Sequence, residues 1–291
     1  MYYFSTRSKL FINASGLGKT RILLEGLCQY WGLYLVCERE TFSSIGSDDL
    51  ASAIRSLAST SGFVHSPLDP SQIQVNTQIA SLSFSRVIAA RLIILWEFLR
   101  VGCASNTITR PMQWLHMQIL PKPDIFRTLA EELFHFPDKF ISKIISLSAN
   151  AIREVIGSGA LFFIVVDEAQ AAATKYPNAF QSASHKGSRP VLTQILRTLC
   201  EVRAPLSYSS TTIVLSGTGI RYDSVRPIVE SNISKNVGFQ TVTDTGTFSP
   251  EDQRKYLIKY LFPNATQFSE ADELFMNHAW RWLRGRYSLK L

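Results

Sequence analysis

The sequence predicts an α/β fold of three layers, in which helices cover both faces of a parallel central sheet. Three observations support this prediction. Residues 9–37 have the pattern of a strand, a loop, a helix and a second strand, which is the building unit of parallel sheets. Strands expected at 161–166 and 211–215 are apolar on both faces, as central strands of such sheets are. Segments with helical periodicity separate these strands along the chain.

Composition narrows the class of protein. Of 291 residues, 46% are hydrophobic and 18% are charged, which is typical of a globular chain of one or two domains. These values exclude disordered and collagen-like classes. The formal net charge of +7 is compatible with a polyanionic partner but does not require one. No two of the four cysteines have C-x-x-C spacing, so neither a zinc site nor a disulfide framework is expected.

The apolar segments argue against membrane contact. The most apolar stretch, 84–100, contains Arg86, Arg91 and Glu97 and is typical of a core helix. The first residues lack the basic-then-apolar order of a signal peptide. We therefore expect a cytoplasmic or nuclear protein that makes no contact with a membrane.

The first residues are expected to form a strand–helix–strand unit, and a helical insertion is expected to follow it. An apolar strand is expected at 9–12, a helix at 19–30 that Gly32 ends, and a buried strand at 33–37. Residues 41–156 are expected to form a helical insertion, where specificity or regulation would lie. Within it we expect loop over most of 41–83, an irregular connection with three prolines at 101–123, and helices at 48–57, 84–99, 124–135 and 139–156.

The second half of the chain completes the sheet. After the strand at 161–166 we expect a loop at 171–188, a helix at 189–202, the strand at 211–215 and a further strand at 237–242. Helices are expected at 249–261 and 272–283. The core would span 1–248, and 249–291 would begin a helical lid or a following domain.

A phosphate-binding loop is the main functional signal. The segment N-A-S-G-L-G-K-T at 13–20 follows a strand and opens a helix, as the Walker A motif of P-loop NTPases does. Its backbone N–H groups would cradle phosphate oxygens at a helix N-terminus. Asn13 stands where this motif has glycine, and the alternative is a glycine-rich turn with a surface lysine. The nucleotide-binding residues predicted here are Ser15, Gly16, Leu17, Gly18, Lys19, Thr20 and Arg21.

A second motif supplies the carboxylates that a phosphate loop requires. The apolar strand at 161–166 runs directly into Asp167 and Glu168, the pattern of a Walker B motif. Asp167 together with Thr20 would hold Mg²⁺, and Glu168 would deprotonate the attacking water. The alternative interpretation is an ordinary polar strand end.

A third strand end offers further candidates. Ser216 or Thr218 would contact the γ-phosphate or the water, although a turn that needs the neighbouring glycines explains the same pattern equally well. Arg221 or Arg226 would neutralise charge during phosphoryl transfer, in the same subunit or in a neighbour, unless it is a surface arginine.

The C-terminal residues 278–290 combine arginines with aromatic side chains. Three interpretations stay open: an amphipathic helix with solvated arginines, a lid arginine that reaches the γ-phosphate, and a nucleic-acid contact.

Several of these segments resemble the nucleotide-binding region of fungal Crinkler-like proteins: Phe11–Tyr34, Ile88–Leu95, Val165–Gln170, Leu215–Ile220 and Trp282–Arg286. The resemblance implies a P-loop NTPase module, with Lys19, Thr20, Asp167 and Glu168 at its motif positions. It also implies membership of a family in which such modules are often joined to a nuclease-like domain of restriction-endonuclease type. Some members of that family are secreted effectors that act in host nuclei. No nuclease motif or translocation segment is visible here, and we expect a truncated member or a fragment.

The function expected from the sequence is Mg²⁺-dependent ATP binding and hydrolysis, used as a switch or a motor, with Lys19, Glu168 and Arg221 as the catalytic residues. ATP is preferred over GTP because no N-K-x-D-like motif is present. The alternatives are a nucleotide-gated interaction module without turnover and a nucleic-acid-binding regulator that uses the basic C-terminus. Expected partners are ATP or ADP, a nucleic acid or protein, and further copies of the chain in a homo-oligomer.

Overall fold

Five parallel strands form the central sheet of the computed structural model, as the sequence predicts. The structure describes residues 8–13, 19–39, 45–105, 109–181, 187–207, 209–218, 240–242, 251, 254–255, 258 and 267–283. The strands lie in the order β2-β3-β6-β1-β7, and all their pairings are parallel. They are β1 (Lys9–Asn13), β2 (Trp31–Val36), β3 (Phe162–Asp167), β6 (Thr211–Thr218) and β7 (Gln240–Val242).

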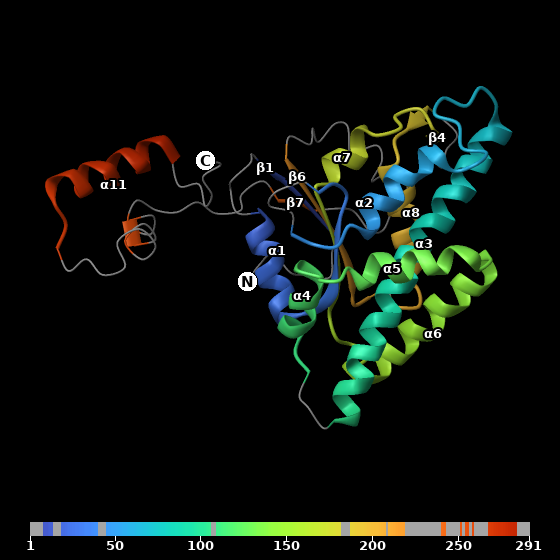
Figure 1. Ribbon diagram of the computed structural model, residues 1–291, viewed down its shortest axis with the longest axis horizontal. Helices are drawn as coiled ribbons and strands as arrows, with labels where there is room; N and C mark the ends of the chain where they lie inside the picture. The colour runs from blue at the N-terminus through green and yellow to red at the C-terminus, as the bar shows by residue number, and fades with distance from the viewer. Residues whose placement is uncertain are drawn as a thin grey trace.

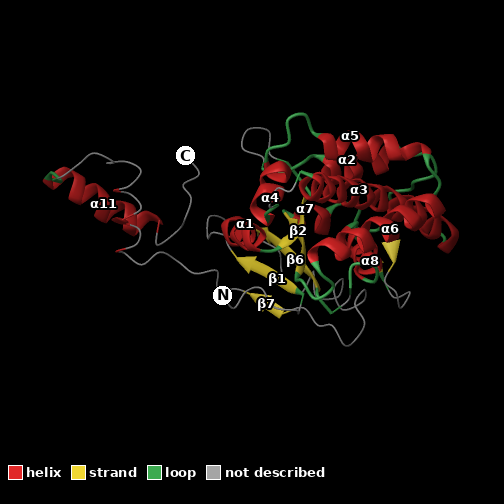
Figure 2. Ribbon diagram, turned by 90° about the horizontal axis from the view of Figure 1, so that it is seen from below, coloured by secondary structure: helices red, strands yellow, loops and turns green. Residues whose placement is uncertain are grey.

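Helices cover both faces of this sheet, so the α/β fold has three layers (Figures 1 and 2). On one face, α1 (Lys19–Gln29) buries Leu23 and Leu27 against Val165 and Val214; we call this the α1-side core. The other face carries the larger core, to which α3 (Pro70–Ala104), α6 (Asp138–Ile156) and α8 (Leu192–Arg203) contribute. Side chains of a strand alternate between faces, so each central strand contributes to both cores.

The remaining elements lie around these layers. They are α2 (Asp49–Ser56), η1 (Leu57–Ser59), α4 (Pro111–Ile119), α5 (Ile125–Glu132), η2 (Leu133–His135), α7 (Ala169–Thr174), α11 (Glu270–Leu283) and the antiparallel pair β4 (Phe180–Gln181) and β5 (Ser188–Arg189). None of the helices in the described ranges is both long and apolar enough to cross a membrane.

The prediction of a loop over most of 41–83 is wrong for residues 70–83, because α3 already begins at Pro70. The Asp69 carboxylate caps the helix by accepting from the Gln72 N–H at 3.0 Å, and Pro70 occupies the first turn. The first turns of α3 bury Asn76, whose side-chain amide donates to the Val64 and Ala179 carbonyls. Because Asn76 is polar, this part of α3 lacks the apolar periodicity that predicts a helix.

The irregular connection predicted at 101–123 is also wrong, since α3 runs to Ala104 and α4 covers the edge of the sheet. Trp114 Nε1 donates to the Gly32 carbonyl of β2 at 2.7 Å, and Gln118 Oε1 accepts from the Tyr34 N–H at 2.9 Å. These side chains satisfy backbone groups that an edge strand otherwise leaves open.

Gly32 does not end the first helix, contrary to expectation, but lies inside β2. A Cβ at this position would be 2.2 Å from the Phe163 carbonyl oxygen of β3. Glycine is therefore required by close backbone approach between two strands rather than by a helix cap.

Two further expectations concern the second half of the chain. The loop expected at 171–188 contains the end of α7, β4 and the first residue of β5, whereas the helix at 189–202 is confirmed as α8. The helices expected at 48–57, 124–135, 139–156 and 272–283 are confirmed as α2, α5 with η2, α6 and α11. Most of the helix expected at 249–261 lies outside the described residues.

A buried ion pair joins helices of the segment that connects β2 to β3 along the chain. Arg91 of α3 donates to both carboxylate oxygens of Asp49 in α2, at 2.6 and 2.9 Å, and neither side chain is exposed. Its Nη1 donates to Gln118 of α4 at 3.0 Å, and its guanidinium lies over the Phe126 ring of α5. One arginine thus fixes four helices relative to one another.

Candidate functional site

The carboxyl ends of three neighbouring strands meet at one edge of the sheet. β3 ends at Asp167 and β6 at Thr218, and Thr218 lies opposite Asn13, the last residue of β1. Because side chains alternate, Asp167 lies on the same face as Val165, beneath α1. The helix that begins at Lys19 therefore starts on the face to which the Asp167 carboxylate points.

Asp167 is the centre of a hydrogen-bonded cluster. Its Oδ2 accepts from Thr20 Oγ1 at 3.0 Å and from the Tyr34 hydroxyl at 2.9 Å, while its Oδ1 accepts from the Glu168 N–H at 3.0 Å. The residue is 3% exposed. Burial, reinforced by the Asp167 charge, raises the pKa of Tyr34, which therefore stays protonated and able to donate. Sequence reasoning missed Tyr34, whose only signal is a hydroxyl within an apolar strand.

Lys19 is buried beside this cluster. It is 7% exposed, and burial lowers the pKa of its ammonium, while the charges of Asp167 and Glu168 act in the opposite direction. A partly desolvated ammonium interacts more strongly with an anion than a hydrated one does. Lys19 and Thr20, the first two residues of α1, thus lie beside the carboxyl end of β3.

Glu168 adopts a backbone conformation that side chains rarely take. Its φ is +52°, in the left-handed region, at the N-cap of α7. Such strain costs about 1–3 kcal/mol and persists where the surroundings hold it, often at functional sites. Its carboxylate accepts a hydrogen bond from Gln170 Nε2. Gln170 is the second residue that sequence reasoning missed, although it belongs to the D-E-A-Q segment.

Ser216 lies on β6, between β1 and β3. By alternation it shares the face of Val214, the α1-side core. It is fully buried, and within the described ranges its Oγ has no hydrogen-bond partner. A buried hydroxyl without a partner is costly unless a ligand or water satisfies it. This observation favours the ligand-contact interpretation of Ser216 over a turn requirement.

Arg21 is not brought to this cluster, unlike Lys19 and Thr20. The Arg21 side chain forms an exposed ion pair with Glu25 along α1, at 2.7 Å. The remaining candidates lie outside the described residues: Ser15, Gly16, Leu17, Gly18, Arg221 and Arg226.

The residues present fit a bound Mg²⁺. This ion prefers oxygen ligands and usually takes one or two from the protein, with phosphate and water supplying the rest. The Thr20 hydroxyl and the Asp167 carboxylate offer two such oxygens within hydrogen-bond distance of each other. The described part of the chain contains no group of three or more His, Cys, Asp or Glu side chains that could hold a metal ion.

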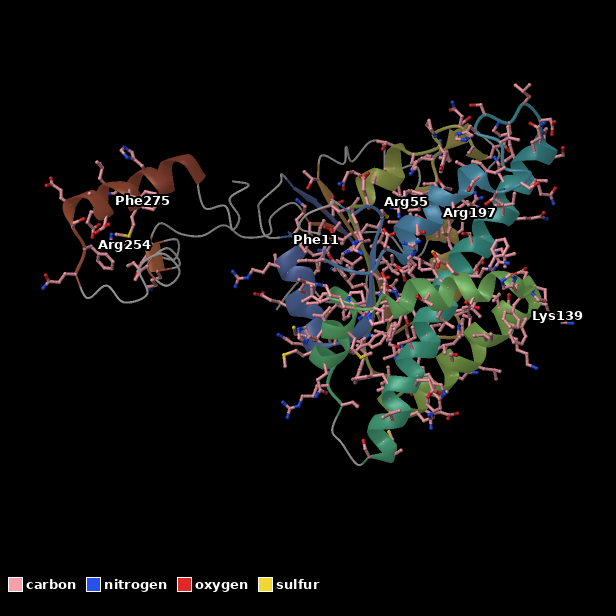
Figure 3. The ribbon with its side chains drawn as sticks, in the orientation of Figure 1. Phe11, Arg55, Lys139, Arg197, Arg254 and Phe275 are labelled. Atoms are coloured by element: carbon pink, nitrogen blue, oxygen red, sulfur yellow. The ribbon has the colours of Figure 1, made fainter. Side chains whose placement is uncertain are left out.

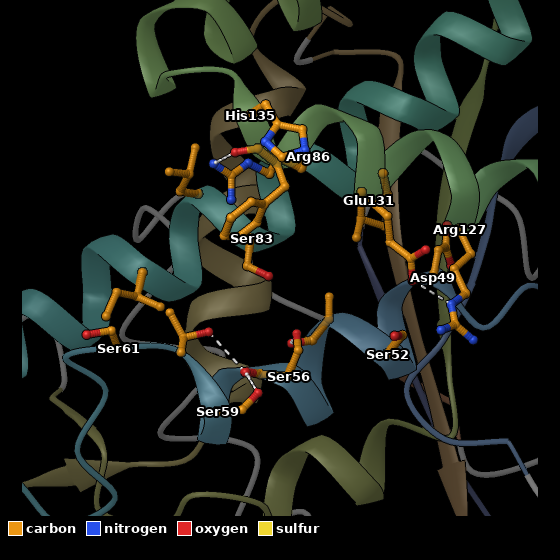
Figure 4. Close-up of a pocket in the computed structure, with 17 residues that line it drawn as sticks. Asp49, Ser52, Ser56, Ser59, Ser61, Ser83, Arg86, Arg127, Glu131 and His135 are labelled. Atoms are coloured by element: carbon orange, nitrogen blue, oxygen red, sulfur yellow. Dashed lines mark hydrogen bonds and ion pairs between the residues drawn. The ribbon is translucent and has the colours of Figure 1, made fainter.

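A separate cavity of about 670 Å³ lies among α2, α3, α5 and η2 (Figure 4). Its charged side chains bind one another or the backbone: Arg127 pairs with Glu131 at 2.7 Å, and Arg86 donates to the Phe134 carbonyl at 2.8 Å. Hydroxyl groups line the rest of it: Ser52, Ser56, Ser59, Ser61 and Ser83. The protein itself thus holds these charged side chains, although the buried Arg86 Nε has no hydrogen-bond partner within the described residues.

No family model, no curated protein and no solved structure matches this chain.

Proposed function

We propose that the protein binds Mg²⁺·ATP at the carboxyl edge of its sheet and hydrolyses it. The observation that carries the proposal is the 3.0 Å contact between Thr20 and Asp167, which lie 147 positions apart in the chain. A hydroxyl at the start of a helix and a carboxylate at the end of a buried strand are the pair that holds nucleotide-bound magnesium in P-loop NTPases. The sequence resemblance to Crinkler-like NTPase modules supports the same reading.

Each described residue of the site has a chemical role in this proposal. Lys19 binds the β- and γ-phosphates, and Thr20 and Asp167 hold the metal. Glu168 accepts a proton from water as the water oxygen bonds to the γ-phosphorus and the bond to the β–γ bridging oxygen breaks, releasing ADP. Ser216 donates to the γ-phosphate or to the water. When bound, Mg²⁺ neutralises charge on the phosphates.

Isothermal titration with Mg²⁺·ATP, beside Lys19→Ala, tests the phosphate site. We expect saturable binding by the wild type and at least a tenfold loss in Lys19→Ala, because the variant lacks the buried ammonium. Lys139→Ala is the matched control, since Lys139 is exposed and lies at the far end of α6 (Figure 3). No binding by the wild type, or equal binding by Lys19→Ala, contradicts the proposal.

Tyr34→Phe is expected to weaken Mg²⁺ binding while leaving ATP affinity without metal unchanged. The substitution removes only the hydroxyl that holds Asp167 Oδ2, and loss of such a supporting hydrogen bond typically costs about 10- to 100-fold in metal affinity or activity. The measurement is the Mg²⁺ concentration that gives half-maximal phosphate release. Tyr30→Phe is the control, because Tyr30 directly follows α1 and its side chain is only partly buried. An unchanged Mg²⁺ requirement would show that Tyr34 does not orient the metal ligand.

A further inference from the structure

We infer that Gln170 is a positioning residue that fixes the Glu168 carboxylate relative to the end of β6. The inference rests on the proposed function and assigns a role that the two nucleotide motifs do not contain. It follows from the two hydrogen bonds that the Gln170 side chain makes.

The first bond comes from the unequal lengths of two neighbouring strands. β3 and β6 are paired up to Val166 and Leu215, after which β3 turns into α7 while β6 continues to Thr218. The Thr218 N–H therefore has no β3 carbonyl to pair with. Gln170 Oε1 takes that place and accepts from the Thr218 N–H at 3.0 Å.

The second bond follows from the first. A backbone N–H only donates, so Gln170 must direct its oxygen to Thr218 and its NH₂ group elsewhere. Nε2 donates to Glu168 Oε2. Because an ionised carboxylate only accepts, this arrangement fixes the orientation of the amide without ambiguity.

The bridge therefore links the proposed general base to the strand that carries Ser216. Glu168 sits in a left-handed conformation at the N-cap of α7, a helix of 6 residues. Through Gln170 the carboxylate is tied to β6, whose buried Ser216 hydroxyl has no hydrogen-bond partner within the described residues. The bridge thus connects the proposed base to the strand that carries the proposed γ-phosphate contact.

Steady-state ATP hydrolysis and ATP titration of Gln170→Met and Gln170→Glu test this role. Methionine keeps the length of the side chain and removes both hydrogen bonds. Glutamate keeps an acceptor for Thr218 but replaces the donor with a second negative charge beside Glu168. We expect kcat to fall by about 10- to 100-fold in both variants, with the dissociation constant of ATP changed less than about threefold.

The two variants separate positioning from a merely structural role. If Gln170 served only to satisfy the Thr218 N–H, Gln170→Glu would retain the wild-type kcat, and that result would overturn the inference. Equal losses in kcat and ATP affinity, accompanied by a lower melting temperature, would overturn it as well. Gln74→Met on the exposed side of α3 is the control for the substitution itself. Absence of ATP binding by the wild type refutes the proposed function, and the inference with it, whereas binding and turnover with an unchanged Gln170→Met refutes the inference alone.

Discussion

Glu168→Gln is expected to lower kcat for ATP hydrolysis by about 10²- to 10⁴-fold, the range that a positioned general base contributes. The amide cannot accept the proton of the attacking water, but it has nearly the same size and can still contact Gln170. Binding of Mg²⁺·ATP should be retained, because Lys19, Thr20 and Asp167 are unchanged. The measurements are single-turnover phosphate release and calorimetric titration of the same preparation.

The outcome separates a hydrolase from a nucleotide-gated interaction module. A module that binds ATP without turnover would show the same negligible phosphate release in wild type and variant, with equal affinities. Glu154→Gln is the matched control, since Glu154 is exposed on α6. Loss of ATP affinity in Glu168→Gln, rather than loss of turnover, would contradict the role assigned to this carboxylate.

Arg91→Ala is expected to lower the free energy of unfolding by about 3–5 kcal/mol, the cost of breaking a buried ion pair by removing one partner. The variant leaves the fully buried Asp49 carboxylate without its two charge-assisted hydrogen bonds and removes a donor to Gln118. Gln118 in turn accepts a hydrogen bond from the edge strand β2, so the substitution also weakens the contact between α4 and the sheet. Urea-induced unfolding of the full chain measures the effect.

A second arginine of the same helix provides the control. Arg100 pairs with Glu97 at 2.7 Å, but both side chains are about half exposed, so Arg100→Ala should leave the free energy of unfolding nearly unchanged. The double variant Arg91→Met with Asp49→Leu should lose less stability than Arg91→Ala, because no unpaired charge stays buried. Similar losses in Arg91→Ala and Arg100→Ala would refute the argument that burial sets the cost.

The local sequence was sufficient where a single segment carries its own pattern. The helix that begins at Lys19 and the strand that ends at Asp167 are both predictable, because periodicity and apolar runs depend only on neighbouring residues. The same applies to the pairing of Thr20 with Asp167, since the carboxyl ends of parallel strands meet at one edge.

The distant residues that complete the site are brought together by the tertiary fold. Nothing local to Tyr34 or Gln170 indicates that one binds Asp167 and the other joins Glu168 to Thr218. Those contacts depend on the strand order, which places β6 between β1 and β3, and on β6 being longer than its neighbour. The start of α3 was hidden for a related reason, because Asn76 is buried by carbonyls from other segments. The sequence around a polar side chain does not indicate which distant residue becomes its hydrogen-bond partner in the folded protein.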